Sequence, residues 1–300
     1  MDIWTRSGMC PNILTMTEQF YQILSDGRVF VDFGPVTMVM MASKNGVILS
    51  GLCSEAALII PDLLTEISQK RQYLSQYPET IDSSCLTGLP LRMVQSVKQI
   101  NEPTLTPIAS VAGTLSDALA DWLYDRSADK VIVNNGGDIA IRLGENQSVK
   151  IGILPNVEIG KLENTVTIRT EDGVGGVCTS GLGGRSFTRG IANAVTVFSK
   201  RCCIADACAT HLANASYVQS AVVITELAGN LLPDSDIADL EVVTQVGKLT
   251  PEEVSHSLAQ IKQESIRQHE LGNLIAVYAD VGGVAMQWEP NEIAQVNNQK

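Results

Sequence analysis

Polar and hydrophobic residues alternate in the first part of the chain that shows a clear pattern. Arg28 to Phe33 alternates as a β-strand does, and Val36 to Ala42 is a second run rich in β-forming residues. Gly34-Pro35 marks a turn between them. Lys44-Asn45-Gly46 is typical of a hairpin turn, after which Val47 to Leu49 continues as a strand. The chain is therefore expected to begin with antiparallel strands.

Helical patterns follow in blocks. The clearest block begins at Pro107 and carries one apolar stripe at steps of three and four, formed by Ile108, Val111, Leu115, Leu119 and Trp122. The small residues on its flank, Ala109, Ala112, Gly113 and Ala118, indicate that something packs close to its backbone. Further helices are predicted for Ser54 to Gln76, from near Leu91 after a long loop (Thr80 to Pro90), for Ala205 to Ala215, and from Thr250 to about Gly272.

Short strands fill the second half of the chain. They are predicted at Lys130 to Asn134, Ile139 to Leu143, Val149 to Leu154, Thr165 to Arg169, Ala194 to Ser199, Leu274 to Ala279 and Val284 to Trp288. A glycine-dense stretch, Gly173 to Gly190, is expected to be a loop. Because strands occur in groups between helical blocks, the pattern favours an α+β fold with a largely antiparallel sheet. The order of the groups hints at a duplicated unit.

No Pro/Ser-rich linker divides the 300 residues. We therefore expect a single domain over residues 28–290, preceded by an N-terminal extension (1–27) and followed by a polar C-terminal tail (291–300).

Composition narrows the functional classes. The formal net charge is −12 and no basic run occurs, so binding to nucleic acid is not expected. No secretory signal or membrane-spanning apolar run is visible, which favours a soluble, cytoplasmic protein. Seven cysteines with no export signal favour reduced thiols, and only three histidines make a zinc site improbable. The high apolar content, 45%, leaves room for a homo-oligomer that covers part of its surface.

Three segments could carry chemistry, and the first is Asn134-Asn135-Gly136-Gly137-Asp138 after a buried strand. The two glycines permit a close backbone approach to a ligand, and the Asp138 carboxylate could accept a hydrogen bond from it. Asn-Gly is also a leading hairpin sequence, so a plain turn is the alternative.

The second segment is the stretch Gly173 to Gly190, in which Cys178-Thr179-Ser180-Gly181 is embedded. Its backbone N–H groups and hydroxyls suit an anion such as phosphate, and Arg185 and Arg189 could add charge. It fits neither a Walker loop nor a dinucleotide fingerprint, and a surface loop without function is the alternative. A thiolate at Cys178 could be stabilised beside the arginines, whereas an inert buried thiol is the alternative.

The third segment lies on the helix expected from Ala205. Asp206, Thr210 and Asn214 stand at i, i+4 and i+8, so three oxygen-bearing side chains share one face. Such oxygens suit a hard cation such as Mg²⁺, which commonly also binds substrate phosphates. The alternative is that Asp206 is only a favourable charge near a helix N-terminus and Thr210 a satisfied hydroxyl.

In this order and spacing the chain resembles the ApbE-like superfamily, most closely its UPF0280 branch. The matching residues are Val111-Ala112-Gly113-Thr114, Asn134-Asn135-Gly136-Gly137-Asp138-Ile139, Val177-Cys178-Thr179-Ser180-Gly181, and Ala205-Asp206-Ala207-Cys208-Ala209-Thr210 with Asn214. The resemblance covers the chain from about Arg28 to the final hairpin and is best between Pro107 and Ala215.

The resemblance implies a fold of duplicated T-fold-like units and a flavin substrate. Enzymes of this superfamily bind FAD and, with Mg²⁺, transfer its FMN part onto a threonine of a protein acceptor. By the resemblance, Asn135, Gly136, Gly137 and Asp138 together with Thr179, Ser180 and Gly181 contact FAD or a related nucleotide. Asp206 and Thr210 hold Mg²⁺, and Asp206 is also a catalytic residue.

Two departures from the family's sequence pattern leave three functional hypotheses open. The family's Lys-Gly is replaced here by Gly113-Thr114, and the His-x-x-Asp-Pro segment with the catalytic histidine is missing from Gly190 to Ser199. The hypotheses are a Mg²⁺-dependent flavin-handling protein or transferase, a sulfur-handling protein, and a catalytically silent nucleotide-binding module. The second follows from the link of methanogen members of this branch to sulfur assimilation into thiols, which would make Cys178 a catalytic residue.

Overall fold

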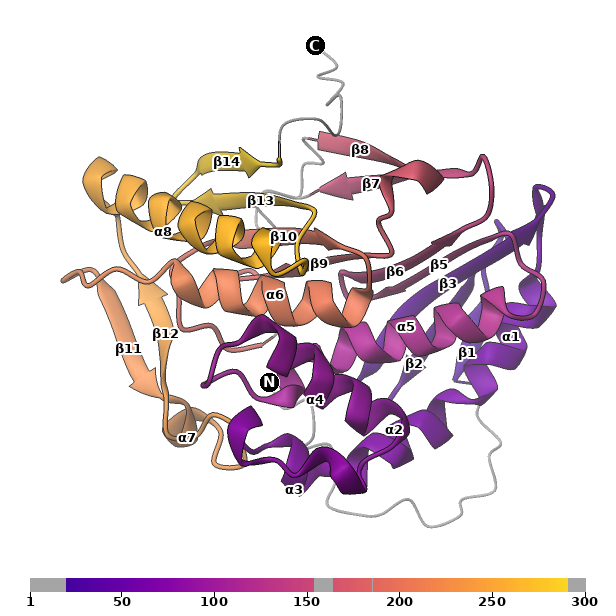
Figure 1. The fold of residues 1–300 in the computed structure, drawn as a ribbon, viewed down its shortest axis with the longest axis horizontal. Coiled ribbons are helices and arrows are strands. Elements are labelled where there is room, and N and C mark those ends of the chain that lie inside the picture. The colour runs from indigo at the N-terminus through magenta and orange to yellow at the C-terminus, as the bar shows by residue number, and fades with distance from the viewer. Residues whose placement is uncertain (1–19, 154–163, 185, 291–300) are drawn as a thin grey trace.

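The computed structural model describes residues 20–153, 164–184 and 186–290. Within them a ten-stranded antiparallel sheet forms the centre of the fold, in the order β1-β2-β3-β5-β6-β9-β10-β13-β14, with β4 paired to β3 (Figure 1). Its strands are β1 (Tyr21–Ile23), β2 (Val29–Phe33), β3 (Val36–Lys44), β4 (Val47–Ile48), β5 (Lys130–Asn135), β6 (Asp138–Leu143), β9 (Gly176–Ser180), β10 (Ala194–Ser199), β13 (Ala276–Val281) and β14 (Val284–Trp288).

Two hairpins lie outside this sheet. They are β7 (Ser148–Ile153) with β8 (Asn164–Arg169), and β11 (Val223–Leu227) with β12 (Glu241–Val246). The helices are α1 (Ser50–Leu58), α2 (Ile60–Ser68), α3 (Arg71–Leu74), α4 (Gly88–Ile100), α5 (Val111–Tyr124), α6 (Cys202–Ala215), α7 (Ala228–Leu231) and α8 (Pro251–Glu270), with the 3₁₀ turns η1 (Pro78–Thr80), η2 (Ser83–Cys85), η3 (Pro107–Ser110) and η4 (Thr170–Asp172).

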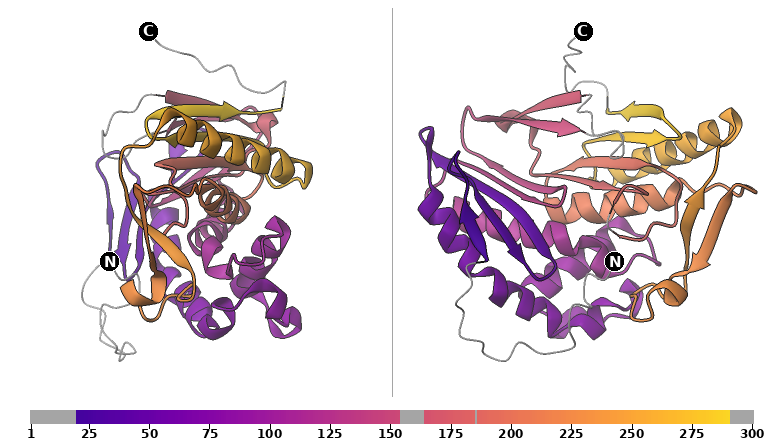
Figure 2. Two further views of the ribbon diagram at one scale, coloured as in Figure 1. Left: turned by 90° about the vertical axis from the view of Figure 1, so that its left-hand side faces the viewer. Right: turned by 180° about the vertical axis from the view of Figure 1, so that it is seen from behind.

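The main core lies between one face of the sheet and helices α1, α5 and α6 (Figures 1 and 2). Alternation explains which residues face it: Val36, Met38, Met40 and Ala42 of β3 are buried and their neighbours along the strand are more exposed. The β7–β8 hairpin covers the opposite face of the sheet through a second apolar cluster that includes Ile141. The expected α+β fold with an antiparallel sheet is confirmed; the duplication of a unit and the single domain stay predictions.

Three expectations about local structure are wrong. The helix expected from Ser54 to Gln76 is three helices. Pro61 occupies the first turn of α2 and cannot continue the hydrogen bonding of α1, which explains the first of the two breaks. The long loop expected from Thr80 to Pro90 contains η2 and the start of α4. The glycine-dense stretch from Gly173 to Gly190 contains strand β9.

Glycine in β9 serves close packing rather than loop flexibility. A Cβ at Gly176 would lie 2.3 Å from Cα of Cys202, so only glycine lets the strand pass the first turn of α6. The sequence pattern also gave no indication of β11, β12 and α7. At the N-terminal side, β1 pairs with β2 in the register Tyr21↔Val31, so the sheet begins before Arg28.

No helix among the described residues is long and apolar enough to cross a membrane.

Candidate functional site

The site is built on the contact between α5 and α6. The Gly113 backbone N–H donates a hydrogen bond to Asp206 Oδ2 at 2.8 Å. A Cβ at position 113 would lie 2.4 Å from the carbonyl oxygen of Cys202, so this approach requires glycine. The close packing expected from the small residues on this helix is therefore present, and it holds the Asp206 carboxylate against the start of α5.

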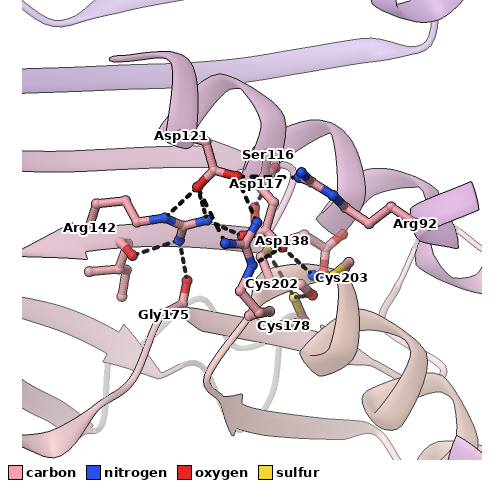
Figure 3. A network of polar contacts seen from close by, with 12 residues as sticks. Arg92, Ser116, Asp117, Asp121, Asp138, Arg142, Gly175, Cys178, Cys202 and Cys203 are labelled. Atoms are coloured by element: carbon pink, nitrogen blue, oxygen red, sulfur yellow. Dashed lines mark hydrogen bonds and ion pairs between the residues drawn. The ribbon is translucent and has the colours of Figure 1, made fainter. Parts of the chain in front are cut away.

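A network of aspartates and arginines fixes the neighbouring elements (Figure 3). Asp117 of α5 is fully buried and accepts from Arg142 Nη2 of β6 at 2.6 Å and from the Cys203 N–H of α6 at 2.9 Å. One turn on, Asp121 pairs with Arg142 and with Arg201 Nη2, at 2.7 Å each. Burial opposes the charged form of Asp121, but the two guanidinium groups outweigh it and lower its pKa. The network ties α5, α6 and β6 into one rigid frame.

This frame carries Asp138 at the start of β6 to the side of α6 that bears Asp206. Ser116 of α5 donates to the Asp138 carbonyl oxygen at 3.1 Å and adds a further link between α5 and β6. A cavity of about 230 Å³ opens in front of these elements, and Asp138, Asp206, Thr210 and Asn214 all line it. The helical spacing of the last three residues is thus realised as one wall.

The rest of the cavity comes from four parts of the chain. Ala109 and Ala112 contribute a wall of small side chains where η3 leads into α5. Arg71, at the start of α3, and Arg189 bring positive charge. The loop between α7 and β12 adds polar and apolar residues, which are Leu232, Asp234, Ser235, Asp236 and Ile237.

The fold gives the ionised form of the Asp206 carboxyl little stabilisation. Burial raises its pKa well above the ordinary value, and the nearby Asp138 carboxylate raises it further. Backbone N–H groups at Gly113 and Ala112 offset only part of this effect. A carboxyl whose pKa is raised by burial and by a neighbouring carboxylate in a cavity is a feature of functional sites, and a bound cation would relieve the repulsion.

Arg189 connects the cavity wall to α6. Its backbone N–H donates to Asn214 Oδ1 at 2.9 Å, and its Nη1 donates to Thr104 Oγ1 at 2.9 Å. The sequence predicts that Arg189 adds charge to an anion site in the glycine-dense stretch; in the structure it lines the cavity that also contains Asp206 and Thr210. Arg185, the other arginine expected there, lies outside the described residues.

The paired glycines form the β5–β6 hairpin turn. Gly136 and Gly137 have φ of 66° and 114°, and the Gly137 N–H donates to Asn134 Oδ1 at 3.0 Å. Asn135 is buried at the end of β5. None of Asn135, Gly136 and Gly137 lines the cavity, so the structure supports the turn interpretation for them and brings only the following Asp138 to the site.

Thr179, Ser180 and Gly181 also lie away from this cavity. Thr179 Oγ1 is 2.8 Å from Thr196 Oγ1 of the neighbouring strand β10. A Cβ at Gly181 would lie 2.8 Å from the Ala192 carbonyl oxygen, so this glycine permits a close backbone contact. The predicted phosphate cradle is therefore not assembled around the cavity.

Cys178 is enclosed in the core. Its Sγ lies 3.4 Å from Cys202 Sγ, and the residue has no exposed surface. Burial raises the pKa of the Cys178 thiol well above its usual value, and the neighbouring Cys202 raises it further. These surroundings favour a protonated, inaccessible thiol and offer no stabilisation of a thiolate.

Sequence reasoning missed Asp236 in the α7–β12 loop. The Thr106 hydroxyl donates to its carboxylate, and burial raises the pKa of Asp236. The two residues are 130 positions apart in the chain, and no local pattern connects them. Among the described residues no three His, Cys, Asp or Glu side chains form a group that could hold a metal ion. A cation bound at Asp206 would thus take most of its ligands from water and from a second molecule bound in the cavity.

These features define an α+β protein with an acidic cavity between two helices and the edge of a β-hairpin. The chain matches the family model described as "AbpE bacteria" over residues 21–286 and belongs to this family. The membership confirms the ApbE-like family expected from the ordered motifs.

Solved structures were also compared. The flavin transferase ApbE from Vibrio cholerae is 15% identical over 62% of this chain and 85% of its own, with a TM-score of 0.41. The apo form of the flavinyl transferase ApbE from Pseudomonas stutzeri is 14% identical over 59% of this chain and 80% of its own, with a TM-score of 0.35. No curated protein matches the chain.

Proposed function

We propose that the cavity at Asp138 and Asp206 binds a flavin nucleotide, FAD or a related compound, together with Mg²⁺. The observation that carries this proposal is the convergence of Asp138, Asp206, Thr210 and Asn214 on one cavity. The ApbE-like resemblance assigns Asp138 to the nucleotide and Asp206 and Thr210 to the metal, and the family match supports looking for such a site in this chain.

The donor set fits a hard, hydrated cation. Asp206 and Thr210 offer a carboxylate and a hydroxyl on one helix face, with the Asp138 carboxylate nearby. The raised pKa of Asp206 is the second argument, because a divalent cation would neutralise the repulsion with Asp138. When bound, Mg²⁺ would supply charge for the nucleotide phosphates, which the carboxylates alone would repel.

The chain's own residues orient and admit the ligand. The Gly113 N–H holds Asp206 Oδ2 in position, and Asp206 lines the cavity. Ala109 and Ala112 present no bulk, so a phosphate-bearing group can come close to the helix backbone. Arg71 and Arg189 line the same cavity and place positive charge within it.

Transfer of FMN to a protein acceptor is the finer part of the proposal. In such a transfer an acceptor hydroxyl oxygen attacks the phosphorus on the FMN side, the pyrophosphate bond breaks, and AMP leaves. The segment from Ile191 to Ser199, which lacks the family's histidine, is almost entirely buried, with β10 buried throughout. This burial favours nucleotide binding without transfer as the second candidate function.

Calorimetric titration tests binding, and product analysis tests transfer. We expect FAD to bind in the presence of Mg²⁺, with at least tenfold weaker binding in EDTA. Asp206→Asn should abolish the Mg²⁺ dependence, whereas the matched change Asp125→Asn, at an exposed position after α5, should not. No binding of FAD, FMN or ADP to the wild-type protein would refute the proposal. Release of AMP with covalent flavin on a threonine-containing acceptor would establish transferase activity.

A further inference from the structure

A second cavity lies on the other side of Arg189. It has a volume of about 580 Å³, and it shares Thr104, Arg189 and Asn214 with the first cavity. Its remaining lining comes from the loop before η3, from α6 and the loop after it, from α8 and from the β11–β12 hairpin. These residues are Glu102, His211, Ala215, Tyr217, Thr225, Glu241, Gln260, Gln263 and Glu264.

The wall of this second cavity is rich in hydrogen-bond acceptors. It contains the carboxylates Glu102, Glu241 and Glu264 against the single guanidinium of Arg189. In addition, the Gln260 Oε1 atom is buried and accepts no hydrogen bond from any described residue. Because three carboxylates line the cavity beside one guanidinium, the wall is complementary to a ligand that carries several N–H donors and a positive charge.

Histidine 211 holds part of this wall in place. His211 is buried, and its Nε2 lies 3.0 Å from Glu264 Oε2, while its Nδ1 lies 3.8 Å from Glu102 Oε2. Arg267 Nε approaches the same Glu264 oxygen at 3.3 Å from outside the cavity. The imidazole therefore holds Glu264 of α8 by a hydrogen bond, and the Glu102 carboxylate lies at a longer distance on its other side.

The spacing of the acidic groups favours an organic cation over a metal ion. No three acidic or imidazole side chains among the described residues converge on one point that could hold a metal. The cavity is also far larger than a single ion requires. Tyr217 adds an aromatic ring to the wall, a group that attracts guanidinium and ammonium ions.

We infer that this second cavity binds a guanidinium or primary ammonium group of a small molecule or of a polypeptide side chain. The inference goes beyond the proposed function and does not depend on nucleotide binding. If the first cavity binds a flavin nucleotide, the cation would bind in a neighbouring cavity, since the two cavities share Thr104, Arg189 and Asn214.

Binding of matched arginine and citrulline ligands tests the inference. The probes are agmatine, N-acetyl-arginine amide and N-acetyl-citrulline amide, titrated by calorimetry at low salt without nucleotide or metal. Citrulline has the shape of arginine without its charge, so we expect both cationic probes to bind and citrulline to bind at least tenfold more weakly. Agmatine alone binding would indicate a small-molecule ligand, and N-acetyl-arginine amide binding as well would indicate a polypeptide side chain. Equal binding of arginine and citrulline, or no binding of either cationic probe, would overturn the inference.

Charge-removing variants locate the site. Glu241→Gln removes an exposed carboxylate, and Glu264→Gln removes the one held by His211; each should weaken cation binding about threefold to tenfold. Glu270→Gln changes an exposed residue on the same helix as Glu264 and should leave binding unchanged. Circular dichroism confirms that each variant is folded, and unchanged affinity in both cavity variants would contradict the inference.

Two further arms separate this inference from the proposed function. Asp206→Asn should bind agmatine as the wild type does, even where it fails to bind FAD. FAD with Mg²⁺ should not displace agmatine, and Mg²⁺ alone should not compete with it. Displacement by either would show that the second cavity belongs to the nucleotide site or to a metal site, and would overturn the inference.

Discussion

Two pairs of aspartates, one on α5 and one beside it, have opposite electrostatic surroundings. Asp117 and Asp121 both form ion pairs with arginines, and the guanidinium groups lower the pKa of Asp121. Asp138 and Asp206 line a cavity, and burial together with their mutual repulsion raises the pKa of Asp206. The first pair has its charge balanced by arginines within the fold, whereas among the described residues only backbone N–H groups favour the ionised form of Asp206. The residue type alone does not distinguish a structural carboxylate from a binding one; its surroundings do.

Removing Arg142 should have the largest effect, because it breaks the balanced pair. Arg142→Met removes the shorter ion pair of the fully buried Asp117 and leaves the longer one, with Arg201 Nε at 3.4 Å, so we expect the free energy of unfolding to fall by up to about 3–5 kcal/mol. Urea denaturation measures the change. Arg126→Met is the matched control, since Arg126 is exposed and stacks on Trp122, and it should cost much less. Similar losses in both variants would refute the structural role of the network.

Gly113→Ala sharpens the comparison by disturbing the contact between α5 and α6 that positions Asp206. The added Cβ would lie 2.4 Å from the Cys202 carbonyl oxygen, so α5 and α6 must separate, at a cost of about 1–3 kcal/mol. The same substitution at Gly51 of α1 meets nothing within 4 Å and should stabilise the protein by about 0.5–1 kcal/mol. Thermal unfolding of the two variants should therefore shift in opposite directions, and parallel shifts would contradict the close-packing account.

Asp206→Asn should stabilise the unliganded protein. Asparagine keeps an acceptor for the Gly113 N–H and removes the charge that burial disfavours, so we expect a rise in Tm of about 2–4 °C, the shift that about 1 kcal/mol produces in chains of comparable size. A carboxyl with a raised folded-state pKa contributes stability at low pH that is lost as the pH rises toward that pKa. The gain should consequently be larger at pH 8 than at pH 5. A variant less stable than wild type at pH 8 would show that the Asp206 charge is already compensated.

The smallest expected effect is a difference in reactivity between two cysteine thiols. Cys178 is buried with a pKa well above its usual value, whereas Cys85 is exposed. Iodoacetamide at pH 8 should therefore modify Cys85 readily in the folded protein and leave Cys178 unmodified until the protein is denatured, as mass spectrometry of the peptides can establish. Selective modification of Cys178 in the folded state would revive the hypothesis of a sulfur-handling protein.

Local patterns predicted the features that depend on neighbouring residues. Alternation placed β2 and β3, and the spacing of Asp206, Thr210 and Asn214 placed them on one wall of the cavity. The Asp117–Arg142 pair could not be predicted, because its members are 25 positions apart on a helix and a strand whose packing is set by the whole fold. The sequence pattern assigns Gly176 to a loop, because glycine is common both in turns and at closely packed positions. Asp236 and Thr106 meet only through tertiary structure.

Proton release on ligand binding tests the central claim most directly. If Mg²⁺, bound together with a flavin nucleotide, stabilises the Asp206 carboxylate, binding must shift this carboxyl toward its ionised form and release a proton. Calorimetric titration of FAD with Mg²⁺ at pH 6, in two buffers of different ionisation enthalpy, measures that release. The account predicts release of a proton by the wild-type protein and none by Asp206→Asn. Binding without any proton release, or an unchanged release in Asp206→Asn, would contradict it.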